Sequence, residues 1–213
     1  MAREGWARIT AGVIGAAVLL SLVPPLAKAL GRGEGLFEAI WGLLRWFTIT
    51  TNLLVGLVFT RLAWRGRDSV GPVLLGGTML AIVLVGVVFN LLLPALPHQT
   101  LWDALGDRTH HVVAPIVVPL WWALFAHHGR LRWSATLAWA AYPLAYIAYS
   151  FARAAVSGPR AGSTSRYPYF FMDIDRFGVP TVALYLLAIS TGFVLAGLLA
   201  VLTDRWLGGM GRD

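Results

Sequence analysis

The chain has 213 residues, of which 58% are hydrophobic and only 13% are charged, and it contains no cysteine. Soluble domains average about 25% charged residues, so this composition predicts an integral membrane protein. The absence of cysteine excludes disulfides, thiol catalysis and thiolate metal sites. The formal net charge of +7 comes from arginines at the ends of apolar runs. Membrane topology explains such a distribution better than nucleic-acid binding, so we expect the bilayer, and no nucleic acid, as a partner.

Six apolar segments follow one another along the sequence, each near the roughly 20 residues that a helix needs to cross a bilayer. They predict an all-α, polytopic membrane protein with six transmembrane helices in one bundle, a single domain over residues 1–213. Prolines inside several segments are compatible with this, because neighbouring helices can satisfy the backbone groups that a proline frees. The expected spans are residues 6–30, 36–62, 72–93, 109–125, 133–156 and 178–202.

The first segment also has features of a secretory signal peptide, with a basic start, an apolar run and the small-residue triplet 27–29. Cleavage there would leave five spans. The apolar run is long for a signal peptide, so we favour an uncleaved helix. Nine Lys and Arg residues would lie on the side of the N-terminus and seven on the other. This bias predicts that both termini are cytoplasmic, and the Arg, Ala and Gly bias suggests the cytoplasmic membrane of a bacterium.

The segment 41–59 carries polar residues within an otherwise apolar run. On one continuous helix Arg45, Thr48 and Asn52 would lie within about 60° of one another. Buried polar groups are costly in a membrane and usually face the protein interior. This pattern predicts a functional stripe, with Thr48 as a nucleophile and Asn52 and Arg45 holding an oxyanion or a carboxylate. The alternative is structural: Thr bonds its own helix, Asn joins helices and Arg45 reaches to the interface.

The fourth segment begins with two adjacent histidines, His110 and His111. A histidine at membrane depth suits general-base catalysis, because its ordinary pKa lies near neutrality. Asp107 stands three residues before His110 and could orient its imidazole. The alternative is that both histidines are only interfacial.

A second histidine pair, His127 and His128, lies in the short turn between the fourth and fifth segments. A helix from His110 to His127 would rise roughly 25 Å, so the two pairs cannot share a metal ion. We expect His127 and His128 to lie in a solvated loop and expect no metal and no cofactor in the protein.

The fifth segment carries a stripe of tyrosines that ends in an arginine, with Ser150 at its margin. Such a stripe could bind a substrate carbonyl or carboxylate, and the alternative is aromatic packing with an interfacial anchor. Asp173 and Asp175 precede the sixth segment, and we favour ion pairs with Arg166 and Arg176 over a metal site for them. The members of the stripe are Tyr142, Tyr146, Tyr149 and Arg153.

Four motifs, taken in order, resemble the bacterial branch of the androgen-induced and androgen-dependent transmembrane protein family. They are WFTITTN (46–52), THHVVAP (109–115), AYPLAYIAYSFAR (141–153) and YPYFFMDIDRFG (167–178). The resemblance implies six transmembrane helices and hydrolysis of fatty acid esters of hydroxy fatty acids by an intramembrane Thr and a His.

Carried over to this chain, the family's threonine corresponds to Thr48, and its histidine, five residues before Pro115, corresponds to His110. The family motif has Asn three residues after the Thr, whereas Asn52 lies four after Thr48. The alternative catalytic residues are therefore Thr50, Thr51 and His111.

The resulting expectation is a lipid ester hydrolase without a cofactor. Standard motifs of soluble hydrolases, such as GxSxG and HExxH, are absent from the sequence. Two further classes stay open: a non-enzymatic lipid-binding or transport protein, and a metal-dependent membrane hydrolase that uses Asp107, His110 and His111, or Asp173 and Asp175.

Overall fold

The computed structural model describes residues 2–93, 100–159 and 164–210. These residues form helices and connecting segments with no β-strand, so the all-α prediction is confirmed for the part of the chain described. The α-helices are α1 (Ala2–Leu20), α2 (Val23–Gly31), α3 (Leu36–Leu43), α4 (Phe47–Arg65), α5 (Pro72–Leu92), α6 (Leu101–Arg108), α7 (Ala114–Phe125), α8 (Ala135–Val156) and α9 (Ile174–Met210). Between them lie the 3₁₀ turns η1 (Arg67–Ser69) and η3 (Phe170–Met172) and the π-helical turn η2 (Thr109–Val113).

Four helical segments within the described residues are long and apolar enough to cross a membrane: Ala2–Gly31, Phe47–Arg65, Pro72–Leu92 and Ile174–Met210. The prediction of a membrane protein is supported to this extent, and six spans are not confirmed. The helix α7 has only 12 residues, although the helical run that contains it begins at Leu101, eight residues before the expected start. The helix α8 has 22 residues, but its tyrosines and Arg153 make it less apolar.

The expected second span, 36–62, is not one continuous helix. The helix α3 ends at Leu43, Trp46 has extended backbone angles, and α4 begins at Phe47. Arg45 lies in this break, so the prediction that it shares a helical stripe with Thr48 and Asn52 is wrong. Glu38 closes the start of α3 through the backbone N–H of Gly35, which makes α3 a separately capped helix. The Thr48–Asn52 pair keeps its spacing on α4.

The chain divides into two compact units, Met1–Leu131 with Thr203–Asp213, and Arg132–Leu202. The prediction of one six-helix domain depends on how these units pack together and stays a prediction.

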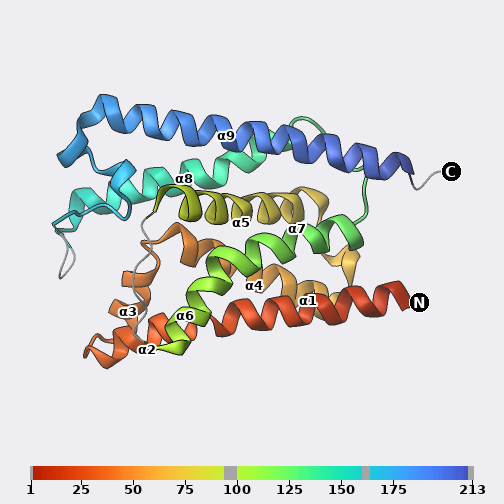
Figure 1. Cartoon of the computed structure of the whole chain (residues 1–213), viewed down its shortest axis with the longest axis horizontal. Helices are drawn as coiled ribbons and strands as arrows, with labels where there is room; N and C mark the ends of the chain where they lie inside the picture. Colours follow the sequence, from red (N-terminus) through yellow and green to blue (C-terminus); the bar gives the residue numbers. More distant parts are fainter. Residues whose placement is uncertain (1, 94–99, 160–163, 211–213) are drawn as a thin grey trace. The chain divides into compact units, whose positions relative to one another are not determined.

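In the first unit α4 packs along α1, and α5 packs against both α4 and α7 (Figure 1). Glycine permits the close contact between α1 and α4, because a Cβ on Gly15 would lie 3.0 Å from the backbone nitrogen of Thr60. Phe59 is fully buried and its ring meets that of Trp121 edge to face at 5.2 Å. The interior of this unit is therefore built by α1, α4, α5 and α7. Packing between these helices determines which of their ends lie close together.

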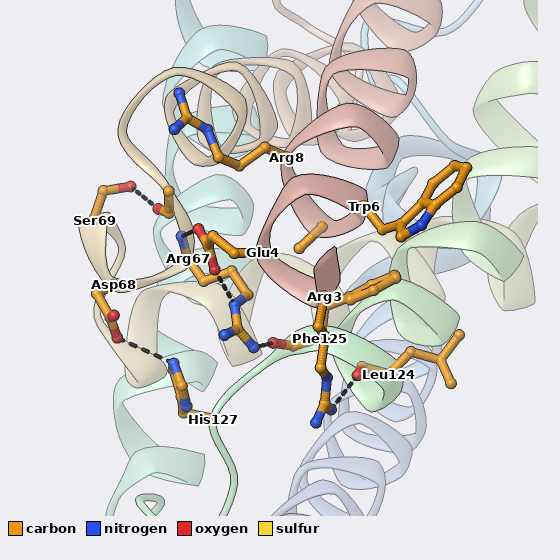
Figure 2. A network of polar contacts seen from close by, with 12 residues as sticks. Arg3, Glu4, Trp6, Arg8, Arg67, Asp68, Ser69, Leu124, Phe125 and His127 are labelled. Atoms are coloured by element: carbon orange, nitrogen blue, oxygen red, sulfur yellow. Dashed lines mark hydrogen bonds and ion pairs between the residues drawn. The ribbon is translucent and has the colours of Figure 1, made fainter. Parts of the chain in front are cut away.

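At the end of the first unit where α1 begins, arginines bind the last carbonyl groups of α4 and α7, and Figure 2 shows those of α7. Arg8 donates to the carbonyls of Ala63 (2.9 Å) and Trp64 (2.7 Å) at the end of α4. Arg67 pairs with Glu4 and donates to the carbonyl of Phe125 (2.9 Å) at the end of α7. Cations stabilise the negative C-terminal end of a helix dipole and satisfy its orphan carbonyls. We refer to this region as the basic end.

The second unit contains α8, η3 and the part of α9 up to Leu202. Arg166 makes a two-pronged ion pair with Asp175, with N–O distances of 2.7 and 2.8 Å. Asp173 accepts a hydrogen bond from the backbone nitrogen of Arg176 at 3.1 Å. The predicted ion pairing thus holds for Asp175 with Arg166.

Candidate active site

Three polar residues of the first unit meet where the ends of four helical elements come together. Thr48 is the second residue of α4, Asp107 lies in the last turn of α6 and His111 lies in η2. Phe89 and Asn90 approach them from the last turn of α5. We call this cluster of Thr48, His111 and Asp107 the candidate site.

The candidate site has the connectivity of a nucleophile, a base and an orienting carboxylate. Thr48 Oγ1 lies 3.3 Å from His111 Nε2, and His111 Nδ1 lies 3.0 Å from both Oδ1 and the carbonyl oxygen of Asp107. The carboxylate Oδ1 and the backbone carbonyl oxygen of Asp107 are hydrogen-bond acceptors, so His111 Nδ1 carries the proton. His111 Nε2 is then left as an acceptor for the Thr48 hydroxyl. The Thr48–His111 distance is at the long end of the hydrogen-bonding range, as is common in a resting catalytic site.

A proline and an asparagine account for the backbone conformation around His111. Pro115 has no N–H, so it cannot donate to the carbonyl of His111 four residues before it. Asn90 takes that place: its Nδ2 donates to the carbonyl of His111 at 2.9 Å and to that of Gly86 at 2.8 Å. The chain forms a π-helical turn here, in which Ala114 N–H donates to the carbonyl of Thr109. Single π-turns inside α-helices are rare and occur frequently at functional sites.

Gly86 allows α5 to approach this turn closely. A Cβ at this position would lie 2.6 Å from Pro115 Cβ and 3.4 Å from the carbonyl oxygen of His111. No side chain larger than hydrogen fits there without movement of the proline. The sequence therefore places a glycine on one helix opposite a proline on the other.

Phe89 fixes the plane of the His111 imidazole. The two rings are stacked, with centroids 3.5 Å apart and planes 7° apart. The imidazole is thus held by the carboxylate of Asp107 at one nitrogen, by the ring of Phe89 on one face and by the contact with Thr48 at its other nitrogen. Such restraint is what a base needs if its acceptor nitrogen is to stay directed at a nucleophile.

The structure brings Thr48 to His111, the alternative base, and not to the preferred His110. His110 is 5% exposed, and its Nε2 has no hydrogen-bond partner among the residues that the structure describes. Its ring is perpendicular to that of His111, with centroids 6.1 Å apart. Asp107 also contacts His111 at a spacing of four residues, and not His110 at a spacing of three. The predicted pairing of Thr48 and Asp107 with His110 is therefore wrong, and both residues contact His111 instead.

The other polar residues of segment 41–59 are all buried or half-buried, and they have different contacts. Asn52 is fully buried, and its Nδ2 donates to the carbonyl of Thr48 at 2.9 Å. Asn52 therefore contacts the backbone of Thr48. Thr50 donates to the carbonyl of Phe47 at 3.0 Å, the backbone bond expected of a threonine in a helix. Thr51 is fully buried and Arg45 is 8% exposed.

The tyrosine stripe belongs to the second unit. Tyr146 and Arg153 are buried, and Arg153 Nη1 donates to the Tyr149 hydroxyl at 2.7 Å. Tyr142 is half-buried on the same helix. Because these residues and the candidate site are in different units, the prediction that they contact one substrate stays a prediction.

His127 and His128 have separate partners in the first unit. His127 lies 3.3 Å from Asp68 (Figure 2). The side chain of His128 is 9% exposed and lies 3.3 Å from Asp204, so the prediction that it is solvated is wrong. Within residues 2–93, 100–159 and 164–210 no three His, Asp or Glu side chains are grouped so that they could hold a metal ion.

Sequence reasoning missed Phe89 and Asn90, which lie near the apparent end of a uniformly apolar segment. Asn90 was the available signal, because an amide in an apolar helix needs a partner. A comparison of the chain with protein-family models, with curated proteins and with solved structures gives no match.

Proposed function

We propose that the protein is a membrane-embedded hydrolase of lipid esters, with Thr48 as nucleophile, His111 as general base and Asp107 as the residue that orients His111. The observation that carries the proposal is the continuous chain of contacts from Thr48 through His111 to Asp107. A threonine hydroxyl is a weak nucleophile at neutral pH, so an adjacent and correctly oriented base is its principal requirement.

In the proposed reaction His111 Nε2 accepts the Thr48 hydroxyl proton as Oγ1 attacks the acyl carbonyl. The ester C–O bond then breaks, and the leaving alcohol takes the proton from His111. Water attacks the acyl-threonine in a second step, His111 accepts one of its protons, and the acid is released with Thr48 restored. Thr48 lies in the first turn of α4, where the positive end of the helix dipole favours negative charge on the tetrahedral intermediate.

Lipid esters fit the surroundings of the candidate site. The described helices that carry it expose large apolar side chains, including Leu53, Leu57 and Leu91 at 37%, 59% and 76%. An acyl chain in the bilayer can lie along such a surface, while its ester group stays near the polar boundary. The resemblance of the four motifs to a family of lipid ester hydrolases supports the same substrate class, and esters of hydroxy fatty acids are the first members to try.

The test is hydrolysis of a panel of lipid esters by the purified protein in detergent. We expect Thr48→Ala to abolish turnover and Asp107→Asn to reduce it about 10²-fold or more, since loss of the orienting carboxylate leaves the base in the wrong tautomer. Thr78→Ala is the matched control, because Thr78 is a buried threonine whose hydroxyl donates only to its own helix, at Leu74.

Wild-type rates in Thr48→Ala would contradict the proposal, provided that the Thr78→Ala protein is active and folded. Loss of activity in Thr50→Ala together with a fully active Thr48→Ala would move the nucleophile to Thr50 and require a different base.

A further inference from the structure

The candidate site lies at one end of the first unit. The helix α4 has 19 residues and a length of about 28 Å, which is close to the roughly 30 Å thickness of a bilayer's hydrocarbon core. Thr48 is its second residue and Arg65 is its last. His111 and Asp107 approach Thr48 from η2 and α6, and α6 packs against α2. We call this the site end; a site at this depth is within reach of the water that the second half-reaction consumes.

The two ends of the first unit differ in charge. Among the described residues the basic end carries seven arginines and three acidic residues, whereas the site end carries four basic and four acidic residues. At the basic end these are Arg3, Arg8, Arg61, Arg65, Arg67, Arg130 and Arg205, with Glu4, Asp68 and Asp204; at the site end they are Lys28, Arg32, Arg45 and Arg108, with Glu34, Glu38, Asp103 and Asp107.

Contacts tie the residues of the basic end to one region. Arg61 Nε donates to the carbonyl of Ser69 at 2.8 Å, and Arg3 donates to that of Leu124 at 2.6 Å. Figure 2 shows Arg3 and Arg67 reaching the end of α7, at Leu124 and Phe125, and Glu4 of α1 meeting Arg67. Asp204 accepts from the backbone nitrogen of Leu131 at 2.8 Å, which places the neighbouring Arg205 at this end as well.

Segments rich in Lys and Arg at the ends of transmembrane helices stay on the cytoplasmic side, and acidic residues contribute little to this rule. Within the first unit, the seven-to-four difference in basic residues therefore favours a cytoplasmic location for the basic end. We infer that the candidate site opens on the opposite, extracytoplasmic side of the membrane and takes its ester substrates from the outer leaflet. The part of this inference that concerns substrates rests on the proposed function. The orientation of the protein can be tested without measuring activity.

The chain contains no cysteine, so single cysteines can report its orientation directly. Gly31, at the end of α2, and Gly71, just before α5, are a matched pair: both are exposed, and a Cβ at either would meet nothing within 4 Å. We expect a membrane-impermeant maleimide, applied to intact bacterial cells with a permeabilised outer membrane, to label the Gly31→Cys protein. The Gly71→Cys protein is expected to react only after the cytoplasmic membrane is opened.

Labelling in detergent gives the full reaction of each thiol as a reference. Labelling of Gly71→Cys in intact cells, or of Gly31→Cys only after the cytoplasmic membrane is opened, would overturn the inferred orientation.

A charged, membrane-impermeant fluorophosphonate separates orientation from function. In its reaction the Thr48 oxygen bonds to phosphorus, fluoride leaves and His111 accepts the hydroxyl proton. We expect labelling of wild-type protein, and not of Thr48→Ala, in right-side-out membranes, and labelling in inverted vesicles only after detergent is added. Absence of labelling in detergent would contradict the proposed function, whereas labelling in inverted but not in right-side-out membranes would contradict only the orientation.

Discussion

At the scale of single residues, the two neighbouring histidines differ in what they contact. His111 touches Thr48, Asp107 and the ring of Phe89, whereas the Nε2 of His110 has no hydrogen-bond partner in the described part of the chain. These contacts are the basis for proposing His111, and not His110, as the base.

We expect His111→Ala to lower kcat for ester hydrolysis by about 10²–10⁴-fold, the usual contribution of a general base. His110→Ala is the matched control, because it removes a similarly buried imidazole, whereas the hydrogen bond of Thr48 is with His111. The protein with His110→Ala should retain activity within about tenfold, a bound that follows from the smaller effect of packing alone. Steady-state kinetics on the folded proteins decide the matter, and equal losses in both variants would refute the assignment.

Asn90 is a positioning residue, since it reaches the candidate site only through the carbonyl of His111. Asn90→Ala leaves that carbonyl without its side-chain donor and releases the π-turn. We expect kcat to fall at unchanged KM, together with slower labelling of Thr48 by a fluorophosphonate. A purely structural role would lower the amount of folded protein and leave the activity per folded molecule unchanged, so activity is normalised to folded protein.

The sequence indicated the residue types of the site but not their geometry. The polarity of Thr48, Asp107 and the histidine pair within or beside apolar segments was sufficient to single them out. The choice between His110 and His111 depends on a π-turn. Such a turn has a wider hydrogen-bonding pattern than an α-helix, so it changes which of two adjacent side chains faces Thr48. That turn follows from Pro115, which has no N–H to donate to the carbonyl of His111, and from Asn90 on α5, whose Nδ2 donates to that carbonyl instead.

At the scale of helices, the close approach of α5 to η2 and α7 depends on Gly86, because a glycine has no side chain to separate them. Gly86→Ala would place a Cβ 2.6 Å from Pro115 Cβ. Overpacking of this kind costs about 1–3 kcal/mol, and relief by movement of Pro115 would displace His111. We expect lower thermal stability and lower kcat together.

Gly192→Ala is the control for this substitution, because Gly192 lies in α9 and a Cβ added there would meet nothing within 4 Å. At that position alanine favours the helix by about 0.5–1 kcal/mol. Thermal unfolding in detergent should therefore shift in opposite directions for the two variants. A stabilised Gly86→Ala protein would show that the helices are not held as the structure has them.

The break between α3 and α4 is an element boundary that the sequence did not predict. Residues 36–62 are predominantly apolar, so hydropathy gives one span, and no proline or glycine lies within the interruption at 44–46. Arg45 and Thr48 would share a helix face only if one continuous helix ran through residues 44–46, which it does not. The i, i+4 relation of Thr48 and Asn52 survived because both lie on α4.

At the scale of the whole chain, the polypeptide leaves the first unit after Leu131 and returns to it at Thr203. Asp204 secures the return: it is 1% exposed, lies 3.3 Å from His128 Nδ1 and accepts from the backbone nitrogen of Leu131. Composition and hydropathy were sufficient to predict an all-α membrane protein. The number of spans depends on α7, which is short, and on α8, which carries several polar residues. Hydropathy alone does not decide whether either helix crosses the membrane.

We expect Asp204→Ala to lower the free energy of unfolding by several kcal/mol, since it leaves a buried N–H of Leu131 and the imidazole of His128 without their acceptor, at about 1–3 kcal/mol for each group. Asp68→Ala is the control, because the ion pair of Asp68 with His127 is exposed and such pairs contribute about 0–1 kcal/mol. Thermal unfolding followed by tryptophan fluorescence compares the two. Equal small shifts would mean that Asp204 does not secure the return of the chain.

The most direct test of the catalytic assignment is the site of covalent modification by a fluorophosphonate in the detergent-purified protein, located by peptide mass spectrometry. The account predicts one adduct, on Thr48, that forms about 10²-fold or more slowly when His111 is replaced by alanine. An adduct on Thr50 or Thr51, or a Thr48 adduct that forms at the same rate without His111, would contradict it.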